Sequence, residues 1–138
     1  MTEKHLLYEN LREKCIYEIV GDRPDQNDGH TFFNYIYWMH IDCLSGRGTL
    51  EESCANKVMD KLDIPVKEVN ACINESFVKT GDFDSYNRLM GADREFANHS
   101  GSNMSPSVTI DGKPYNGKFK ADDIYEAVCQ SYHHLRQP

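Results

Sequence analysis

The spacing of apolar and polar residues predicts a chain of short helices with strands near both ends. Leucines recur at helical spacing in residues 3–13, so we expect a short helix there. The next run, CIYEIV at residues 15–20, is apolar and rich in β-branched side chains, which predicts a buried strand. The polar segment GDRPDQNDGH, residues 21–30, predicts a loop.

Helical spacing returns after this loop. One helix is expected from Thr31 to about Cys43, with an apolar face made of Phe33, Ile36, Tyr37, His40, Ile41 and Leu44. Thr49 and Glu52 form a capping-box pattern that starts a second helix. A third begins with Pro65 in its first turn, and Val66, Val69 and Ile73 form its buried stripe. Residues 76–103 are polar and predict short helix and loop.

The C-terminal third predicts a hairpin and a helix. Strands are expected at 107–110 and about 114–118, joined by the strong turn signal Asp111-Gly112. An amphipathic helix follows from about residue 120. The order of elements is that of an α/β, thioredoxin-like fold, with a helical insertion at about 46–103 ahead of the strand entered by Pro106. We therefore expect one domain over residues 1–138, with Pro106 as the cis-proline of such folds.

Charge and hydropathy narrow the classes of partner. The 22 acidic residues outnumber the 15 basic ones, and the net charge of -7 argues against nucleic acid or an anionic membrane as partner. No apolar run approaches the roughly 20 residues of a membrane span, so direct membrane insertion is not expected. Residues 1–15 lack the apolar block of a secretory signal, which predicts either a cytosolic protein or a mature or excised piece.

Five widely spaced cysteines favour an oxidising compartment, because they contain no Cys-x-x-Cys and no zinc-knuckle spacing. Cys43 and Cys54 flank the turn between two predicted helices and are the favoured disulfide. Cys72 and Cys129 are the next candidates, and Cys15 is then left unpaired. Five reduced thiols are the alternative, since sequence alone does not settle connectivity.

The other sequence motifs give only weak evidence for a functional site. Asn-x-Ser sequons at Asn74, Asn98 and Asn103 support secretion, although Pro106 so close to the third weakens it as an acceptor. The acidic loop that begins at Asp25 fails the register of a calcium-binding loop. We predict no bound metal and no cofactor.

The reactive cysteine of a thioredoxin-type enzyme is missing. It normally stands at the N-terminus of the helix after the first core strand, where the helix dipole stabilises a thiolate. The corresponding residues here, 21–33, contain no cysteine and are acidic. We therefore predict that the protein is not an enzyme. The alternative is a secretory-pathway oxidoreductase that uses an atypical pair such as Cys43 and Cys54.

Aromatic residues are dense around the second predicted helix. The cluster of Phe32, Phe33, Tyr35, Tyr37 and Trp38 cannot all be buried in one core. We expect part of it to form a recognition surface, with Phe32, Phe33, Tyr35 and Trp38 as the candidates. The alternative is that the cluster packs inside the fold.

Several stretches in the same order resemble the central thioredoxin-like luminal domain of vacuolar sorting receptors. They are LREKCIYEIV, FFNYIYWMHIDC, EESCANKVMDKLDIPVKEVNAC, SPSVTIDGKPYNGKF and IYEAVCQSY. All five cysteines fall where that family tends to have them, whereas Phe32-Phe33 stand where it favours tryptophans. Such receptors are type I membrane proteins that carry soluble proteins from the Golgi towards the vacuole.

The resemblance implies a non-catalytic luminal module that serves cargo or partner binding, or receptor architecture. Its partners would be a cargo peptide or protein and the other domains of a larger receptor. Its location would be the lumen of the secretory pathway or the cell exterior. A structural extracellular glycoprotein module is a further alternative.

Overall fold

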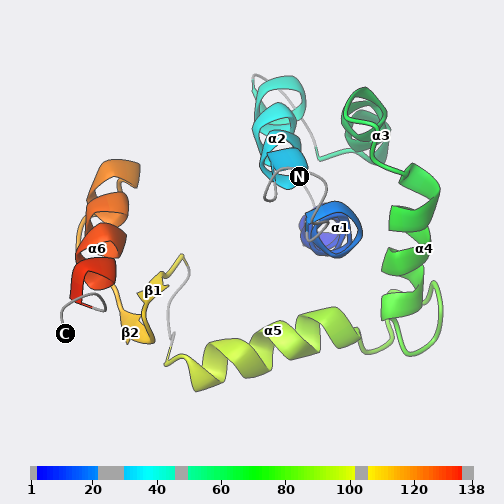
Figure 1. Ribbon diagram of the computed structural model, residues 1–138. Coiled ribbons are helices and arrows are strands. Elements are labelled where there is room, and N and C mark those ends of the chain that lie inside the picture. Colours follow the sequence, from blue (N-terminus) through cyan, green and yellow to red (C-terminus); the bar gives the residue numbers. More distant parts are fainter. Residues whose placement is uncertain (1–2, 22–29, 46–49, 102–105, 135–138) are drawn as a thin grey trace. The chain divides into compact units, whose positions relative to one another are not determined.

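The computed structural model describes residues 3–21, 30–45, 50–101 and 106–134 (Figure 1). The chain forms two compact units, residues 1–90 and 91–138.

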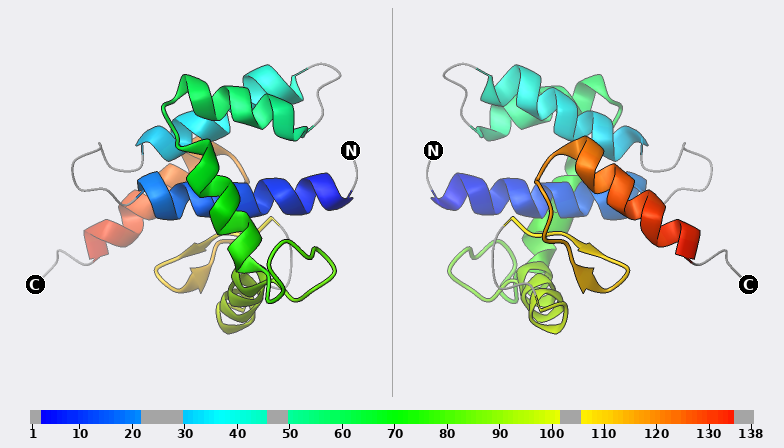
Figure 2. Two further views of the ribbon diagram at one scale, coloured as in Figure 1. Left: turned by 90° about the vertical axis from the view of Figure 1, so that its right-hand side faces the viewer. Right: turned by 90° about the vertical axis from the view of Figure 1, so that its left-hand side faces the viewer.

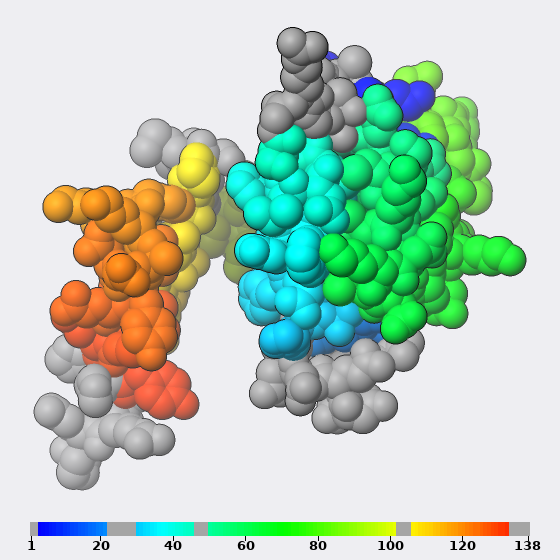
Figure 3. All heavy atoms as spheres, turned by 90° about the horizontal axis from the view of Figure 1, so that it is seen from above, coloured from blue at the N-terminus to red at the C-terminus, as the bar shows by residue number. Residues whose placement is uncertain are grey.

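Unit 1 is helical. Its elements are α1 (Glu3–Ile16), the π-helix η1 (Tyr17–Gly21), α2 (His30–Trp38), the π-helix η3 (Met39–Leu44), α3 (Glu52–Lys61), α4 (Val66–Ser76) and the start of α5 (Arg88–His99). Helix α4 runs across α1, as Figure 2 shows, and the atoms of α2 and α3 lie side by side in Figure 3. Among the described residues, the buried apolar core lies entirely in this unit and includes Leu11, Ile16, Tyr35, Met59, Val69, Ile73 and Phe77.

The strand predicted at residues 15–20 is wrong, because this stretch is helical. Cys15 and Ile16 end α1, and η1 continues the helical path to Gly21. Leu11 and Cys15 are spaced four residues apart, as are Ile16 and Val20, and all four are buried. Such i, i+4 spacing places side chains on one helical face. The longer-range spacing therefore overrides the local β-branched composition.

The helix predicted over residues 31–43 is present as α2 followed by η3, but its predicted buried face is wrong. Tyr35, Met39 and Cys43 point into the core, whereas Phe33 and Tyr37 are 65% and 57% exposed. Two attachments on the inner face explain this orientation. The Tyr35 hydroxyl donates a hydrogen bond to buried Glu9, and Cys43 is disulfide-bonded to Cys54.

The two central helices occur where the sequence places them. Thr49 of the expected capping box lies outside the described residues, and Glu51 is the N-cap of α3. Pro65 is the N-cap of α4 rather than a residue of its first turn. Val69 and Ile73 form the buried stripe of α4, which confirms that part of the prediction.

Unit 2 contains the rest of α5, the strands β1 (Thr109–Ile110) and β2 (Lys113–Pro114), and α6 (Ala121–His134). The strands pair antiparallel, as the sequence predicts, but each is only two residues long. Asp111 and Gly112 take φ values of 52° and 74°, the left-handed region that a tight hairpin turn requires. Among the residues of this unit whose burial is described, 91–101 and 106–132, none is buried.

The described parts are therefore mostly helical with one small sheet, which is compatible with an α/β class. They contain no strand corresponding to the expected first core strand. The extent of a helical insertion and the boundaries of a single domain stay predictions.

Candidate functional site

The disulfides differ in part from the expected pattern. Cys43 at the end of η3 is bonded to Cys54 near the start of α3, the pair that the turn geometry favoured. Cys15 is bonded to Cys72, which corrects the prediction that Cys15 is left over and that Cys72 and Cys129 form a pair. The reason is the helical conformation of residues 15–20, which places Cys15 on the face of α1 that meets α4. Cys129 on α6 is a partly exposed free thiol.

Neither bond resembles an exchange-active pair. The partners are separated by 57 and 11 positions, not by the three of a Cys-x-x-Cys motif. Cys15 and Cys43 are 0% and 2% exposed, so an external thiolate has poor access to these two sulfur atoms, whereas their partners Cys72 and Cys54 are partly exposed. The arrangement suits permanent cross-links between helices.

The four aromatic residues predicted as a recognition surface are not presented together. Tyr35 is fully buried, Phe32 and Trp38 are partly buried, and Phe33 projects from the surface. The exposed stripe of this helical stretch consists of Phe33, Tyr37, Ile41 and Leu44. Lys61 lies over the Trp38 ring at 3.1 Å from its centroid, which further covers that indole.

The other expected positions are more dispersed. Asn74 and Asn98 are exposed on α4 and α5, and both remain predicted glycan acceptors. Asn103 lies outside the described residues. Pro106 is described and exposed, but Ser105 is not described, so the peptide bond between them lies outside the structure's description.

Helix α1 contains a buried ionic cluster that is not among the site residues predicted from the sequence. The Arg12 guanidinium pairs with the Glu9 carboxylate, which also accepts the Tyr35 hydroxyl at 2.7 Å. Burial, and then the Glu9 charge, raise the pKa of neighbouring Glu13 to about 7, although Arg12 opposes this shift. The sequence pattern that could have indicated this cluster is the spacing of Glu9 and Arg12, which are three residues apart and flank Leu11 on the face that α1 buries.

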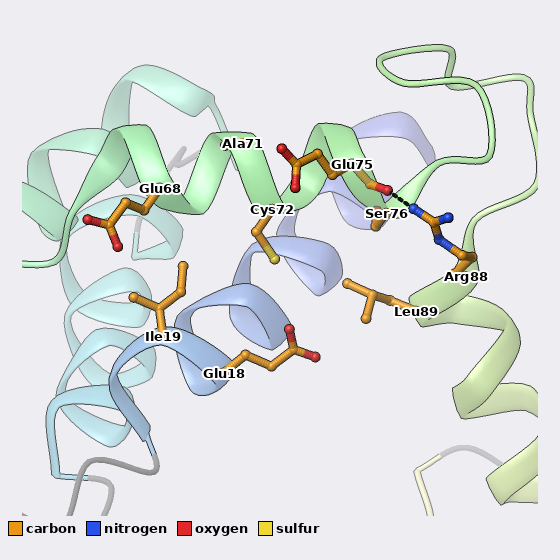
Figure 4. A pocket seen from close by; sticks show the side chains of 9 residues that line it. All are labelled: Glu18, Ile19, Glu68, Ala71, Cys72, Glu75, Ser76, Arg88 and Leu89. Carbon is orange, nitrogen blue, oxygen red and sulfur yellow. Dashed lines mark hydrogen bonds between the residues drawn. The ribbon is translucent and has the colours of Figure 1, made fainter.

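A hollow of unit 1 lies between η1, α4 and the start of α5 (Figure 4). It has a volume of about 590 Å³ and is lined by Glu18, Ile19, Glu68, Ala71, Cys72, Glu75, Ser76, Arg88 and Leu89. Of these residues, only Cys72 is a site residue predicted from the sequence. The pocket depends on elements far apart along the chain, which local patterns do not bring together.

Polar contacts fix the wall that α5 contributes. The Asn87 amide donates to the Ser76 hydroxyl at 2.6 Å, and its oxygen accepts the Met90 backbone N–H at 3.1 Å. The second contact caps the first turn of α5. The Arg88 guanidinium also donates to the backbone carbonyl of Glu75 (Figure 4). Arg88 and Leu89 are therefore held beside the C-terminal end of α4.

The lining of this pocket combines apolar and charged side chains. Its floor is apolar, from Ile19, Ala71, Leu89 and the Cys72 side of a disulfide, and its rim carries three carboxylates and one guanidinium. No group of three or more potential metal ligands occurs among the described residues. None of the helices in the described ranges has the length and apolar character needed to cross a membrane.

Comparison with known proteins gives a consistent set of relatives. A family model described as the vacuolar sorting receptor thioredoxin-like domain matches residues 1–129. Vacuolar-sorting receptor 6 of Arabidopsis thaliana is 21% identical over 139 residues, covering 98% of this chain and 21% of the receptor. Vacuolar-sorting receptor 7 of the same plant is 20% identical over 141 residues, with the same coverage of both chains. The chain thus spans about a fifth of the length of the curated relatives it matches.

Proposed function

The chain belongs to the vacuolar sorting receptor thioredoxin-like domain family, and on that premise we propose that it is a non-catalytic, luminal protein-binding module of sorting-receptor type. Its ligand in this proposal is a cargo or partner protein. The curated relatives are named as sorting receptors, which supports a role in recognition.

The observation that carries the proposal is the placement of the disulfides. Cys15–Cys72 joins α1 to α4, and Cys43–Cys54 joins η3 to α3, so each bond stabilises contacts between helices. Exchange chemistry needs an accessible, low-pKa thiolate, whereas these bonds lie in or beside the core. Such cross-links persist in oxidising compartments, which supports a luminal or extracellular location.

Two surfaces of unit 1 are suited to a protein ligand. One is the exposed stripe of Phe33, Tyr37, Ile41 and Leu44, and the other is the carboxylate-rimmed pocket beside α4. Exposed aromatic side chains are common anchors in protein interfaces.

A receptor chimera tests the binding role. The matching region of Vacuolar-sorting receptor 6 is replaced by residues 1–138, and delivery of a soluble vacuolar reporter is compared with secretion in cells lacking the endogenous receptor. We expect the chimera to restore delivery and a receptor without the region to fail. Equal delivery by both receptors would show that the region has no recognition role.

An insulin-reduction assay tests the absence of catalysis. We expect the native protein to give no turnover above the uncatalysed rate, beside a dithiol oxidoreductase as positive control. Turnover that disappears in Cys43→Ser/Cys54→Ser would instead establish the oxidoreductase alternative. Mass mapping of disulfides in the same sample checks that both bonds are intact.

A further inference from the structure

We propose that the pocket between η1, α4 and the start of α5 binds one lysine or arginine side chain from an extended segment of the partner protein. This inference rests on the proposed function as a binding module and assigns a site and a ligand class to it. Three features of the pocket favour such a side chain: the charge of its rim, its apolar floor and its fixed walls.

The rim favours a cation. Glu68 and Glu75 are seven residues apart on α4, so they lie on one side of the helix at a rise of roughly 10 Å. Glu18 projects from η1 on the facing wall (Figure 4). With Arg88 as the one cationic side chain of the lining, three carboxylates leave a formal charge of −2. A guanidinium or ammonium group complements this rim.

The floor favours a cation that carries an alkyl stem. Ile19 lies on the η1 wall and Leu89 on the α5 wall, with Ala71 and Cys72 between them on α4 (Figure 4). Lysine and arginine bury their methylene groups against apolar surface and keep the charged end near polar groups. The pocket offers both environments within one hollow.

The walls are held in place before any ligand arrives. The Cys15–Cys72 disulfide ties the floor of the pocket to α1, and the Arg88 contact with the Glu75 carbonyl fixes the α5 wall. Glu18 and Ile19 both belong to the π-helical turn η1. Single π-helical turns recur at functional sites. A fixed site loses less entropy when it binds.

The size of the hollow favours a polypeptide over a small ion. A volume of about 590 Å³ exceeds the space of one side chain and falls within the usual range of ligand pockets. One basic residue and its apolar neighbours in an extended segment fill such a space. Nucleic acid is disfavoured by the net charge of -7.

Peptide binding to the 138-residue chain tests the assignment. The probes are fluorescein-labelled Ala-Leu-Arg-Leu-Ala and its glutamine analogue Ala-Leu-Gln-Leu-Ala, measured by fluorescence anisotropy at low and at physiological salt. We expect the arginine peptide to bind about tenfold more tightly, with a preference that weakens at higher salt. Equal affinity for the two peptides would overturn the proposal.

Matched variants locate the site. Glu68→Gln/Glu75→Gln removes two exposed carboxylates of the rim, and we expect it to reduce arginine-peptide affinity about tenfold. Glu51→Gln/Glu52→Gln removes the same charge from exposed residues at the start of α3 and should leave affinity unchanged. An equal loss in both variants would show non-specific attraction. Displacement of the peptide by N-acetyl-arginine amide at equal affinity would refute recognition of a segment.

The chimera distinguishes this site from the general function. A chimera that sorts its reporter although the two peptides bind equally refutes only the pocket assignment. A chimera that fails, with arginine-peptide binding lost in Glu68→Gln/Glu75→Gln alone, refutes the sorting role and supports the pocket.

Discussion

Residues 1–90 and 91–138 differ in how they obtain their stability. The first unit contains every buried apolar residue of the described chain and both disulfides. The second contains a hairpin with two residues per strand and a helix whose apolar side chains remain exposed, among them Tyr125, Val128 and Tyr132. Helical spacing of apolar residues occurs in both units, but only the first buries them against one another.

The two strands of the hairpin in unit 2 differ in the backbone groups that they direct away from each other. Thr109 lies opposite Pro114, and Tyr115 donates its backbone N–H to Val108 at 2.9 Å. The alternation of an antiparallel ladder then directs the backbone N–H and C=O of Thr109 away from β2. Pro114 has no N–H for its own outer edge, which makes β2 a natural edge strand. An isolated two-stranded hairpin is marginally stable, so we expect unit 2 to need further strands or apolar cover.

The largest predicted effect comes from separating the two units. A fragment of residues 1–90 should unfold cooperatively with both disulfides formed, because it retains the entire described core. A fragment of residues 91–138 should show no cooperative transition, because none of its residues in the ranges 91–101 and 106–132 is buried. Circular dichroism during urea titration of each fragment measures both expectations.

The intact chain is the control for this pair of measurements. A cooperative transition in the isolated 91–138 fragment, at a concentration where it is monomeric, would contradict the contrast between the two units.

The second prediction concerns the cross-link between α1 and α4. Cys15→Ser/Cys72→Ser should lower the free energy of unfolding by about 4 kcal/mol, because the bond closes a loop of 57 residues. Cys43→Ser/Cys54→Ser should cost about 3 kcal/mol, since its loop spans only 11 residues. Urea denaturation of the intact chain measures both. The reverse ranking would show that loop entropy does not govern these bonds.

The third prediction concerns the ionic cluster in the core of unit 1. Arg12→Leu removes the cation from the Glu9 carboxylate and leaves a buried charge unpaired, which should cost about 3 kcal/mol. Tyr35→Phe removes only the 2.7 Å hydrogen bond to Glu9 and should cost about 1 kcal/mol. Differential scanning calorimetry ranks the two variants.

The double variant Glu9→Gln/Arg12→Leu is the control for this cluster. It should recover part of the loss, because no unpaired charge remains. A double variant less stable than Arg12→Leu alone would contradict the explanation by an unpaired charge.

The parts of the fold that sequence predicts well are those set by local chemistry. Asp111-Gly112 specifies the hairpin turn, and the spacing of Val69 and Ile73 specifies the buried stripe of α4. The strand prediction for residues 15–20 is wrong because tertiary contacts, not local chemistry, decide their conformation. Their composition favours a strand, while tertiary burial of Cys15 and Ile16 against α4 selects a helix.

The candidate site was harder to predict because its parts meet only in the fold. Because the local sequence predicts a strand at Cys15, it does not indicate that Cys15 faces Cys72. The sequence therefore predicts neither this disulfide nor the pocket floor beside it. Glu18 and Leu89 line one hollow although they are far apart along the chain. The exposed Phe33 was expected in a recognition cluster, whereas the burial of Tyr35 depends on a hydrogen bond to a helix 26 residues away.

The smallest predicted effect is a dependence of unit 1 on pH through Glu13. Burial and the Glu9 carboxylate raise the pKa of Glu13 to about 7 in the folded protein, above its usual 4.5. Between these values the folded chain retains a proton that the unfolded chain has lost, so stability falls as pH rises through this window. The size of this pKa shift sets an upper bound near 3 kcal/mol on the stability that is lost as pH rises. Because Glu13 is partly exposed, we expect a smaller loss of about 1 kcal/mol.

Urea denaturation at about pH 5 and about pH 8 measures this loss for the native chain. Glu13→Gln should remove about 1 kcal/mol of the difference, because its side chain does not titrate. Glu3→Gln, at an exposed position of the same helix, should leave the difference intact. If Glu13→Gln and the native chain lost equal stability between the two pH values, another titrating group would cause the pH dependence, and the burial of Glu13 would not explain it.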